Sequence, residues 1–205
     1  MRFDYVIVGA GSAGCALANR LSEDGRYRVA LIEAGPRDTS PWIHIPVGYF
    51  RTMGNPKMDW CYETQEDAGI ANRSIPWPRG RVLGGSSSIN GLLYVRGQAQ
   101  DYDGWAQMGC TGWSWSDVLP YFKRAEGRAE GGDTYRGGDG PLSTSYGPLD
   151  NPLHQAWLDA AQQAGYSLTE DYNGYAQEGF GRMDMTVRNG TRCSAAKAYL
   201  YEARK

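Results

Sequence analysis

Two short hydrophobic runs flank an amphipathic segment near the start of the chain. Tyr5–Val8 and Val29–Ile32 are uninterrupted apolar runs of strand length, whereas residues 12–21 carry apolar side chains at helical spacing. Gly25 supplies a stop for that helix. Two apolar strands joined by one helix favour a parallel pair that is buried on both faces, so the pattern predicts an α/β fold.

The hydrophobic periodicity disappears between Pro36 and about Arg79, where prolines recur. This pattern predicts a long irregular excursion with short helical turns, and loops of this length are usually functional. Farther along, residues 117–126 present apolar side chains on one helical face, with Ser114 or Ser116 as the N-cap. Pro120 must then lie in or near the first turn of that helix.

The sequence pattern in the last third of the chain predicts a loop and two helices. Residues 130–140 are glycine-rich and polar, which is typical of a surface loop. Asn151 is a credible N-cap for a helix that has proline at its first position and stops at Gly165. A final helix is expected over residues 194–203. From these patterns we divide the chain into segments 1–35, 36–79, 80–145 and 146–205.

Composition excludes several classes of protein. The 205 residues contain 21 Lys and Arg against 23 Asp and Glu, a net charge of −2 that gives no reason to bind nucleic acid. No apolar stretch approaches the roughly 20 residues of a transmembrane helix, and no secretory leader is evident. The four cysteines are dispersed without a C-x-x-C pair, so we expect no metal site, reduced thiols and a cytoplasmic location.

Glycine is the outlier, since 28 residues is about twice the usual share of roughly 7%. The first informative cluster, G-x-G-x-x-G over residues 9–14, is weak alone, but here it follows a predicted strand and opens a helix. Gly9 permits a tight turn, Gly11 lets the backbone approach a pyrophosphate, and Gly14 lets the helix pack closely on the strand. The helix N-terminus then offers N–H groups and a positive dipole end to the phosphates.

Glu33 ends the second predicted strand, nineteen residues after Gly14. A carboxylate there accepts hydrogen bonds from both ribose hydroxyls of an adenosine and repels a 2′-phosphate, which disfavours NADP. NAD and FAD carry the same adenosine diphosphate and stay indistinguishable at this point. The whole strand, glycine, helix, strand and acid arrangement predicts a Rossmann-like dinucleotide-binding unit.

The second cluster covers Gly80–Gly91 and reads GRVLGGSSSING. Small residues of this kind let the backbone contact a flat or charged ligand, with N–H groups and hydroxyls facing it. A flexible linker is the alternative from composition alone, although Leu83, Ile89 and Leu92 argue for burial.

These residues resemble the glucose-methanol-choline (GMC) family of FAD-dependent oxidoreductases, whose signature has the form G-R-x-L-G-G-S-S-x-x-N. Family-like segments extend over nearly the whole chain, through Gly140-Pro141-Leu142 to residues 190–195. The resemblance implies that segment 146–205 includes the start of a substrate (cap) region. The resemblance implies an FAD-binding part of an enzyme that oxidises the CH–OH group of a small alcohol by hydride transfer to flavin N5. The electrons would then pass to an acceptor, either oxygen or a quinone-like molecule.

The resemblance also implies a set of cofactor-binding residues. The pyrophosphate contacts would come from Gly9, Gly11, Ser12, Ala13 and Gly14, and the ribose contacts from Glu33 and Ala34. Arg81, Leu83, Gly84, Gly85 and Ser86 would line the cofactor cradle. Asn90, Gly91, Leu92 and Leu93 would run beneath the flavin, and Trp60 is a weaker assignment.

Two departures from the family pattern refine this expectation. Some relatives attach FAD through a histidine just before the signature asparagine, where this chain has Ile89, so we expect dissociable FAD. The family's catalytic histidine lies in a C-terminal part beyond residue 205, and neither His44 nor His154 matches its motif. We therefore expect an incomplete, N-terminal portion of such an enzyme, with no catalytic residue of its own.

Three alternatives stay open on the sequence alone. The chain could be a flavin-binding but catalytically inert piece, or part of a lyase or photodecarboxylase of the same fold. An NAD-dependent dehydrogenase explains residues 9–33 but leaves Gly80–Asp103 without a role.

Overall fold

A computed structural model describes residues 2–147 and 150–203. The chain divides into two compact units, one formed by Met1–Leu92 with Val187–Lys205 and the other by Leu93–Thr186. The second unit is thus inserted into the sequence of the first. Each unit is described by itself below.

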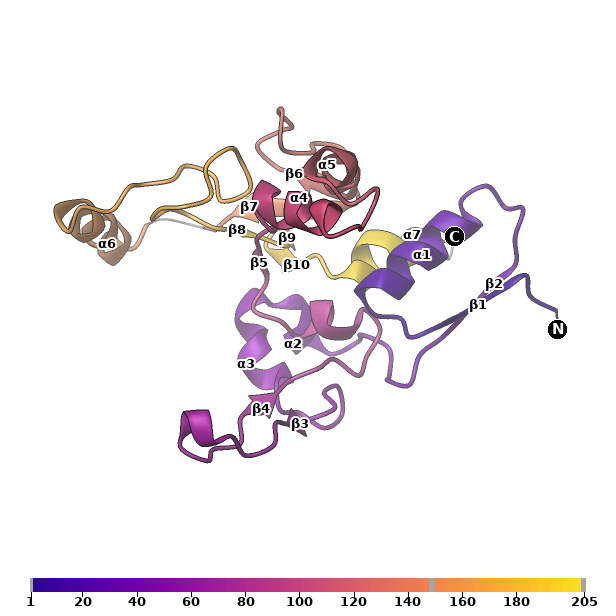
Figure 1. Cartoon of the computed structure of the whole chain (residues 1–205). Helices are drawn as coiled ribbons and strands as arrows, with labels where there is room; N and C mark the ends of the chain where they lie inside the picture. Colours follow the sequence, from indigo (N-terminus) through magenta and orange to yellow (C-terminus); the bar gives the residue numbers. More distant parts are fainter. Residues whose placement is uncertain (1, 148–149, 204–205) are drawn as a thin grey trace. The chain divides into compact units, whose positions relative to one another are not determined.

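The first unit opens with the predicted βαβ element (Figure 1). Strands β1 (Tyr5–Val8) and β2 (Val29–Ile32) pair in parallel, and α1 (Ser12–Ser22) connects them. Gly25 follows α1 with a φ of +70°, the left-handed conformation that the helix stop requires. The predicted elements and the parallel pairing are therefore confirmed.

Burial of this strand pair on both faces is not observed. Val6 is 58% exposed and Val8 84% exposed, and the strands form a two-stranded sheet in the described part of the chain. Burial of a strand depends on the layers that cover it, which the apolar pattern of the strand itself does not specify.

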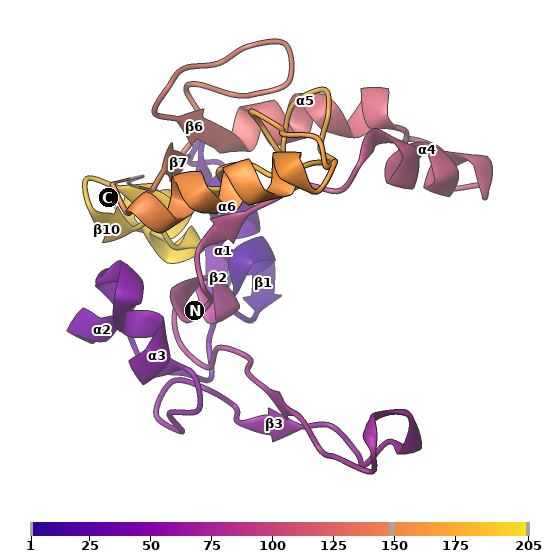
Figure 2. The same ribbon diagram turned by 90° about the vertical axis from the view of Figure 1, so that its left-hand side faces the viewer.

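The irregular excursion has the short helical turns that the sequence predicts. They are α2 (Pro41–His44), η1 (Pro46–Gly48), α3 (Tyr49–Thr52) and η2 (Ala68–Ile70). Strands β3 (Tyr62–Glu63) and β4 (Pro76–Trp77) form an antiparallel pair, with β3 labelled in Figure 2. The segment ends near the helical turn η3 (Gly85–Ser88).

The core of the first unit lies beneath this excursion. Ile43, Met58, Val82 and Ile89 form one buried hydrophobic cluster, which brings α2 against the glycine-rich segment. Residues 187–203 complete the unit with a hairpin of β9 (Val187–Arg188) and β10 (Thr191–Arg192), then the π-helical η4 (Ala196–Leu200) and α7 (Tyr201–Ala203). The predicted final helix is thus present, mostly with π-helical hydrogen bonding.

The second unit is built on a four-stranded sheet with the order β5-β8-β7-β6. Its strands are β5 (Leu93–Tyr94), β6 (Glu126–Arg128), β7 (Leu142–Tyr146) and β8 (Asp184–Met185). Its helices are α4 (Ala99–Gln107), α5 (Trp115–Ala125) and α6 (Pro152–Gln163) (Figure 2).

The predicted helices of this unit are present, and two details qualify them. Ser114 caps α5 through a capping box, but Pro120 lies in the second turn, where the ring removes one internal hydrogen bond. Asn151 caps α6 through its bond from the Leu153 N–H, yet Leu153 is 73% and Trp157 63% exposed. Helical spacing therefore identified α6 without identifying which side chains are covered.

Residues 130–140 are not entirely a surface loop, because Arg136 is fully buried. Its guanidinium contacts Glu126 at 2.5 Å, Asp184 at 2.8 Å and Asp171 at 2.6 Å. Arg96 also reaches Glu126 at 2.5 Å, and the Thr144 hydroxyl donates to the same carboxylate at 2.8 Å. This buried ionic cluster ties β6, β8 and the loop together.

The ionisation of this cluster follows from its contacts. Burial opposes the charge on Glu126, but hydrogen bonds from Arg136 and Thr144 and the charges of Arg136 and Arg96 hold its pKa below the ordinary value. Asp184 differs, since burial outweighs its arginine contacts and raises its pKa. Glu126 is thus the fixed negative centre of the cluster.

Within the described ranges 2–147 and 150–203, no helix combines the length and apolar character needed to cross a membrane.

Candidate functional site

The G-x-G-x-x-G segment forms the turn between β1 and α1. Gly9 has a φ of +93°, which glycine adopts without strain, and Gly11 is the N-cap of α1. A Cβ on Gly14 would lie 1.9 Å from the Gly9 carbonyl oxygen, so only glycine permits this packing of helix on turn. A Cβ on Gly11 would meet no atom within 4 Å, which leaves open space above that position.

The start of α1 presents free donors to this space. The N–H groups of Ser12 and Ala13 have no acceptor in the described part of the chain, whereas the Cys15 N–H already bonds to the Gly11 carbonyl at 2.9 Å. Unpaired N–H groups at a helix N-terminus, together with the helix dipole, attract an anion such as a pyrophosphate.

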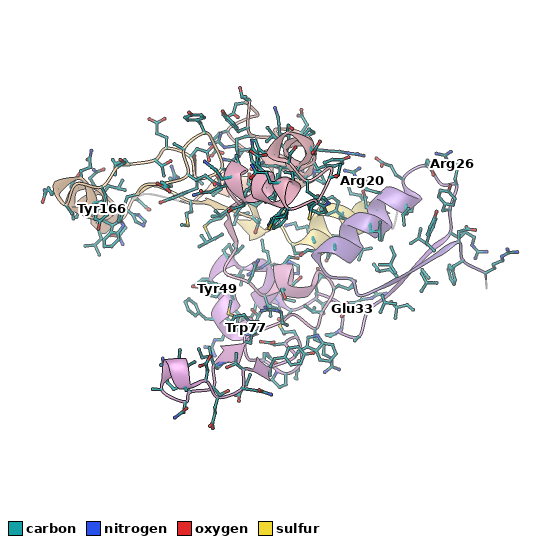
Figure 3. All side chains as sticks on the ribbon, viewed as in Figure 1. Arg20, Arg26, Glu33, Tyr49, Trp77 and Tyr166 are labelled. Atoms are coloured by element: carbon teal, nitrogen blue, oxygen red, sulfur yellow. The ribbon has the colours of Figure 1, made fainter. Side chains whose placement is uncertain are left out.

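Glu33 lies just after β2, next to the glycine turn (Figure 3). One carboxylate oxygen accepts from the Ala10 N–H at 2.7 Å, and the other accepts from the Gly35 N–H at 2.8 Å. These bonds fix the orientation of the carboxylate, and each oxygen keeps a lone pair for a further donor.

The second glycine cluster contacts the first directly. The Gly84 N–H donates to the Ala10 carbonyl at 2.8 Å, and a Cβ on Gly85 would lie 2.7 Å from the Gly11 Cα. Both Gly84 and Gly85 have positive φ angles, of +88° and +55°. The two motifs therefore form one surface, and a side chain at Gly85 would separate them.

Together these segments line a cavity of about 590 Å³ in the first unit. Its walls include Val8, Gly9, Gly11, Ser12, Ile32, Glu33, Ala34, Trp60, Tyr62, Arg79, Gly80, Gly85 and Ser86. The rings of Trp60 and Tyr62 are parallel, with centroids 6.0 Å apart, and form an aromatic part of the wall. The cavity thus combines backbone donors, one carboxylate, one guanidinium and flat aromatic faces.

Eight of the residues predicted from the sequence line the cavity, namely Gly9, Gly11, Ser12, Glu33, Ala34, Trp60, Gly85 and Ser86. The others lie outside its lining. Ala13 and Gly14 belong to α1, while Arg81 places its guanidinium carbon 5.3 Å from the Trp60 ring centroid. Leu83 donates its N–H to the Pro36 carbonyl at 3.0 Å, and Gly84 contacts Ala10 as described.

The segment Asn90–Leu93 is occupied by contacts within the protein. Asn90 Oδ1 accepts from the Leu92 N–H at 3.1 Å and from Arg192 at 2.7 Å. Leu92 is 1% exposed and adopts a φ of +68°, whereas Leu93 begins β5. Space is open beside Gly91, where a Cβ would have no neighbour within 4 Å.

Sequence reasoning missed five residues of the lining, Val8, Ile32, Tyr62, Arg79 and Gly80, and the two with aromatic or charged side chains are Tyr62 and Arg79. Both flank segments that it did consider, since Tyr62 follows Trp60 by two positions and Arg79 precedes the signature. The alternation of Trp60 and Tyr62 on one face of an extended segment is a signal that could have found the tyrosine.

The remaining candidate groups lie away from this cavity. His44 Nε2 contacts the Asp38 carbonyl oxygen at 2.7 Å, and His154 is on α6. Cys15 is buried beneath the turn, and burial raises the pKa of its thiol to about 11. No group of three His, Cys, Asp or Glu side chains within residues 2–147 and 150–203 is arranged to hold a metal ion.

Comparison with known proteins gives consistent matches. The family model for GMC oxidoreductase matches residues 3–205. The chain is 57% identical over 205 residues to the oxygen-dependent choline dehydrogenase of Photobacterium profundum, covering 99% of this chain and 36% of that protein. Its structure matches that of pyridoxine 4-oxidase from Mesorbium loti with a TM-score of 0.92 and 38% identity, over 99% of this chain and 40% of the other.

A further solved structure that matches is described as that of an FAD-dependent enzyme. The FAD-dependent oxidoreductase from Chaetomium thermophilum matches with a TM-score of 0.86 and 31% identity, over 97% of this chain and 36% of that one. The chain therefore spans between a third and two fifths of the length of these relatives. Because the family model covers almost every residue, the chain belongs to the GMC oxidoreductase family of flavoproteins and corresponds to its N-terminal, FAD-binding portion.

Proposed function

We propose that this chain forms the FAD-binding part of an oxidoreductase that oxidises the CH–OH group of a small alcohol. One observation carries the proposal: the glycine turn, Glu33 and the Gly85–Ser86 turn line a single cavity. The residues fit the cofactor, since the open space above Gly11 and the free N–H groups of α1 suit a pyrophosphate. Glu33, with a lone pair left on each oxygen, suits a ribose.

Charge and shape in the cavity support the same ligand. Arg79 supplies a positive charge to its lining, which compensates a phosphate, and Trp60 and Tyr62 offer flat apolar faces. When bound, FAD would accept a hydride from the alcohol carbon at N5 and pass the electrons to oxygen or a quinone-like acceptor. This chain's residues bind and orient the cofactor. We assign none of them the role of base that removes the hydroxyl proton.

Choline is the first substrate to test, because the relative at 57% identity is described as an oxygen-dependent choline dehydrogenase. A pyridoxine-like alcohol is the second, on the structural match at 38% identity. A flavin-binding but inert piece is the main competing proposal, and a lyase or photodecarboxylase of the same fold is another. A cytoplasmic location is part of the proposal, because the four cysteines are dispersed along the sequence without a C-x-x-C pair.

Binding and reduction separate these functions. The purified chain is expected to bind FAD, seen as a shifted flavin spectrum and quenched flavin fluorescence, and not to retain NAD under the same conditions. Choline is then added without oxygen, with tetramethylammonium as the control cation that lacks a CH–OH group. Bleaching by choline alone supports alcohol oxidation, whereas a yellow chain that no alcohol bleaches is a binding piece. Failure to bind FAD contradicts the whole proposal.

The bound FAD is expected to dissociate from denatured protein. Ile89, which precedes the signature asparagine, is 1% exposed and has a hydrocarbon side chain that cannot form a covalent flavin bond. Acid precipitation of the loaded protein should therefore leave all yellow colour in the supernatant and a white pellet. Free FAD carried through the same steps gives the reference recovery. A pellet that stays yellow after washing in denaturant would contradict dissociable binding.

A further inference from the structure

Arg192, at the end of β10, places a positive charge in the interior of the first unit. Arg192 is 1% exposed, and burial lowers the pKa of its guanidinium to about 10. The guanidinium donates to the carbonyls of Ile43 at 2.8 Å, Ser87 at 3.1 Å and Asn90 at 2.8 Å, and to Asn90 Oδ1 at 2.7 Å. Every one of these acceptors is neutral.

The other two buried arginines show how unusual this is, and the first, Arg96, contacts the carboxylate of Glu126. Arg136 is equally buried but contacts three carboxylates, from Glu126, Asp171 and Asp184. Among residues 2–147 and 150–203, no carboxylate lies within 4.0 Å of Arg192. A charge removed from water without a counter-charge is costly, and four neutral acceptors compensate it only in part.

The contacts of Arg192 converge on one turn. Asn90 is held through both its side-chain and its main-chain oxygen, and the same Oδ1 accepts the Leu92 N–H. Leu92 has a φ of +68°, a strained conformation for a leucine that surrounding contacts must maintain. Arg192 therefore braces the turn at Gly91, beside which the space is open.

We propose that Arg192 is a positioning residue for the cofactor: it fixes the Asn90–Leu92 turn against the flavin, and its uncompensated charge stabilises negative charge gained by the flavin on reduction. This inference rests on the proposed function and on the family resemblance, which implies that residues 90–93 run beneath the flavin. The Ser87 carbonyl that accepts from Arg192 also belongs to the residue next to Ser86, which lines the cavity. A buried cation attracts an anion more strongly than an exposed cation does, because the dielectric constant of its surroundings is low. The missing counter-charge would then be the reduced cofactor rather than a side chain.

The test compares Arg192→Gln, which removes the charge, with Arg192→Lys, which keeps it while losing the planar fork. Arg188→Gln is the matched control, because Arg188 lies on the same hairpin but is exposed. FAD affinity is measured by fluorescence titration. The equilibrium constant for reducing the bound flavin is measured against a reference dye with dithionite, which needs no substrate. Hydrogen exchange of the Leu92 amide is measured without cofactor.

Arg192→Gln is expected to lower the equilibrium constant for reduction at least about tenfold, or about 30 mV for a two-electron couple. Arg192→Lys should change it much less, although both variants should accelerate exchange of the Leu92 amide. Arg188→Gln should match the unmodified protein in all three measurements. Unchanged reduction in Arg192→Gln would overturn the charge role, and unchanged Leu92 exchange would overturn the bracing role.

A second variant covers the case in which Arg192→Gln does not fold. Asn90→Asp keeps both hydrogen bonds to Oδ1 and places a carboxylate 2.7 Å from the guanidinium, which neutralises the charge without removing it. It should also lower the reduction constant, and an unchanged constant would overturn the inference. If the unmodified protein fails to bind FAD, the proposed function falls together with the charge role. If that protein binds FAD and the variants do not differ from it, only the Arg192 inference falls.

Discussion

Replacement of Glu126 by glutamine is expected to lower the free energy of unfolding by about 3–5 kcal/mol, the loss typical of breaking a buried ion pair from one side. Glu126 is fully buried between Arg96 and Arg136, and Gln keeps its size while removing the charge. Two buried guanidinium groups would then lose their shared carboxylate partner. Urea unfolding followed by tryptophan fluorescence measures the change.

Glu170→Gln is the matched control, since Glu170 is exposed in the same unit and forms no ion pair with any residue in the ranges 2–147 and 150–203. Its stability should stay within about 0.5 kcal/mol of the unmodified protein. A Glu126→Gln loss no larger than that of the control would show that the buried cluster contributes little.

The lowered pKa of Glu126 predicts that the protein loses stability in acid. The pKa of Glu126 is lower in the folded protein than its ordinary value of 4.5, so its contribution is complete above that pH. It disappears as pH falls through the lowered, folded-state pKa. Asp184 acts in the opposite direction, because burial raises its pKa. If Glu126 causes this effect, the free energy of unfolding of Glu126→Gln should fall less steeply with decreasing pH than that of the unmodified protein. An equally steep fall in both proteins would exclude Glu126 as the cause.

Alanine at Gly14 is expected to lower the stability of the protein, whereas alanine at Gly11 is expected to lower its affinity for FAD. Gly14→Ala places a methyl group 1.9 Å from the Gly9 carbonyl oxygen, so the turn must move and the protein should lose about 1–3 kcal/mol or more. Gly11→Ala meets no atom, so thermal stability of the cofactor-free protein should hardly change. Its methyl group occupies the space proposed for the pyrophosphate, and FAD affinity should fall at least about tenfold, equal to about 1.4 kcal/mol.

Thermal unfolding without cofactor and fluorescence titration with FAD separate the two effects. Gly25→Ala is a useful reference for Gly14→Ala, because its strain arises from a φ of +70° at a surface turn rather than from a clash. If Gly11→Ala binds FAD as tightly as the unmodified protein does, the pyrophosphate does not approach this turn.

The sequence predicted those parts of the fold that depend on local periodicity. β1, α1 and β2 follow from the spacing of apolar residues, and Asn151 marks the start of α6 through its capping chemistry. The family resemblance, carried by the two glycine motifs, is confirmed by the match over residues 3–205.

Features that depend on distant partners could not be predicted in this way. Arg136 lies in a polar, glycine-rich segment that indicates a surface loop, and its burial depends on carboxylates as far along the chain as Asp184. The contact of Gly85 with Gly11 likewise joins two motifs whose separation in sequence carries no information about their distance in space. Exposure of Val8 on β1 is a third example, because a strand's own pattern does not specify its cover.

Insertion of the second unit between Leu92 and Val187 has a consequence for the order of folding. Asn90 and Arg192 are 102 positions apart, so their hydrogen bond closes only after the whole inserted unit has been synthesised. Long-range contacts of this kind carry a large loop-closure cost and slow the folding reaction. The inserted unit is continuous in sequence, and we expect it to form while the first unit is still open on the ribosome. The turn beside Gly91 would accordingly be among the last parts of this chain to acquire its native shape.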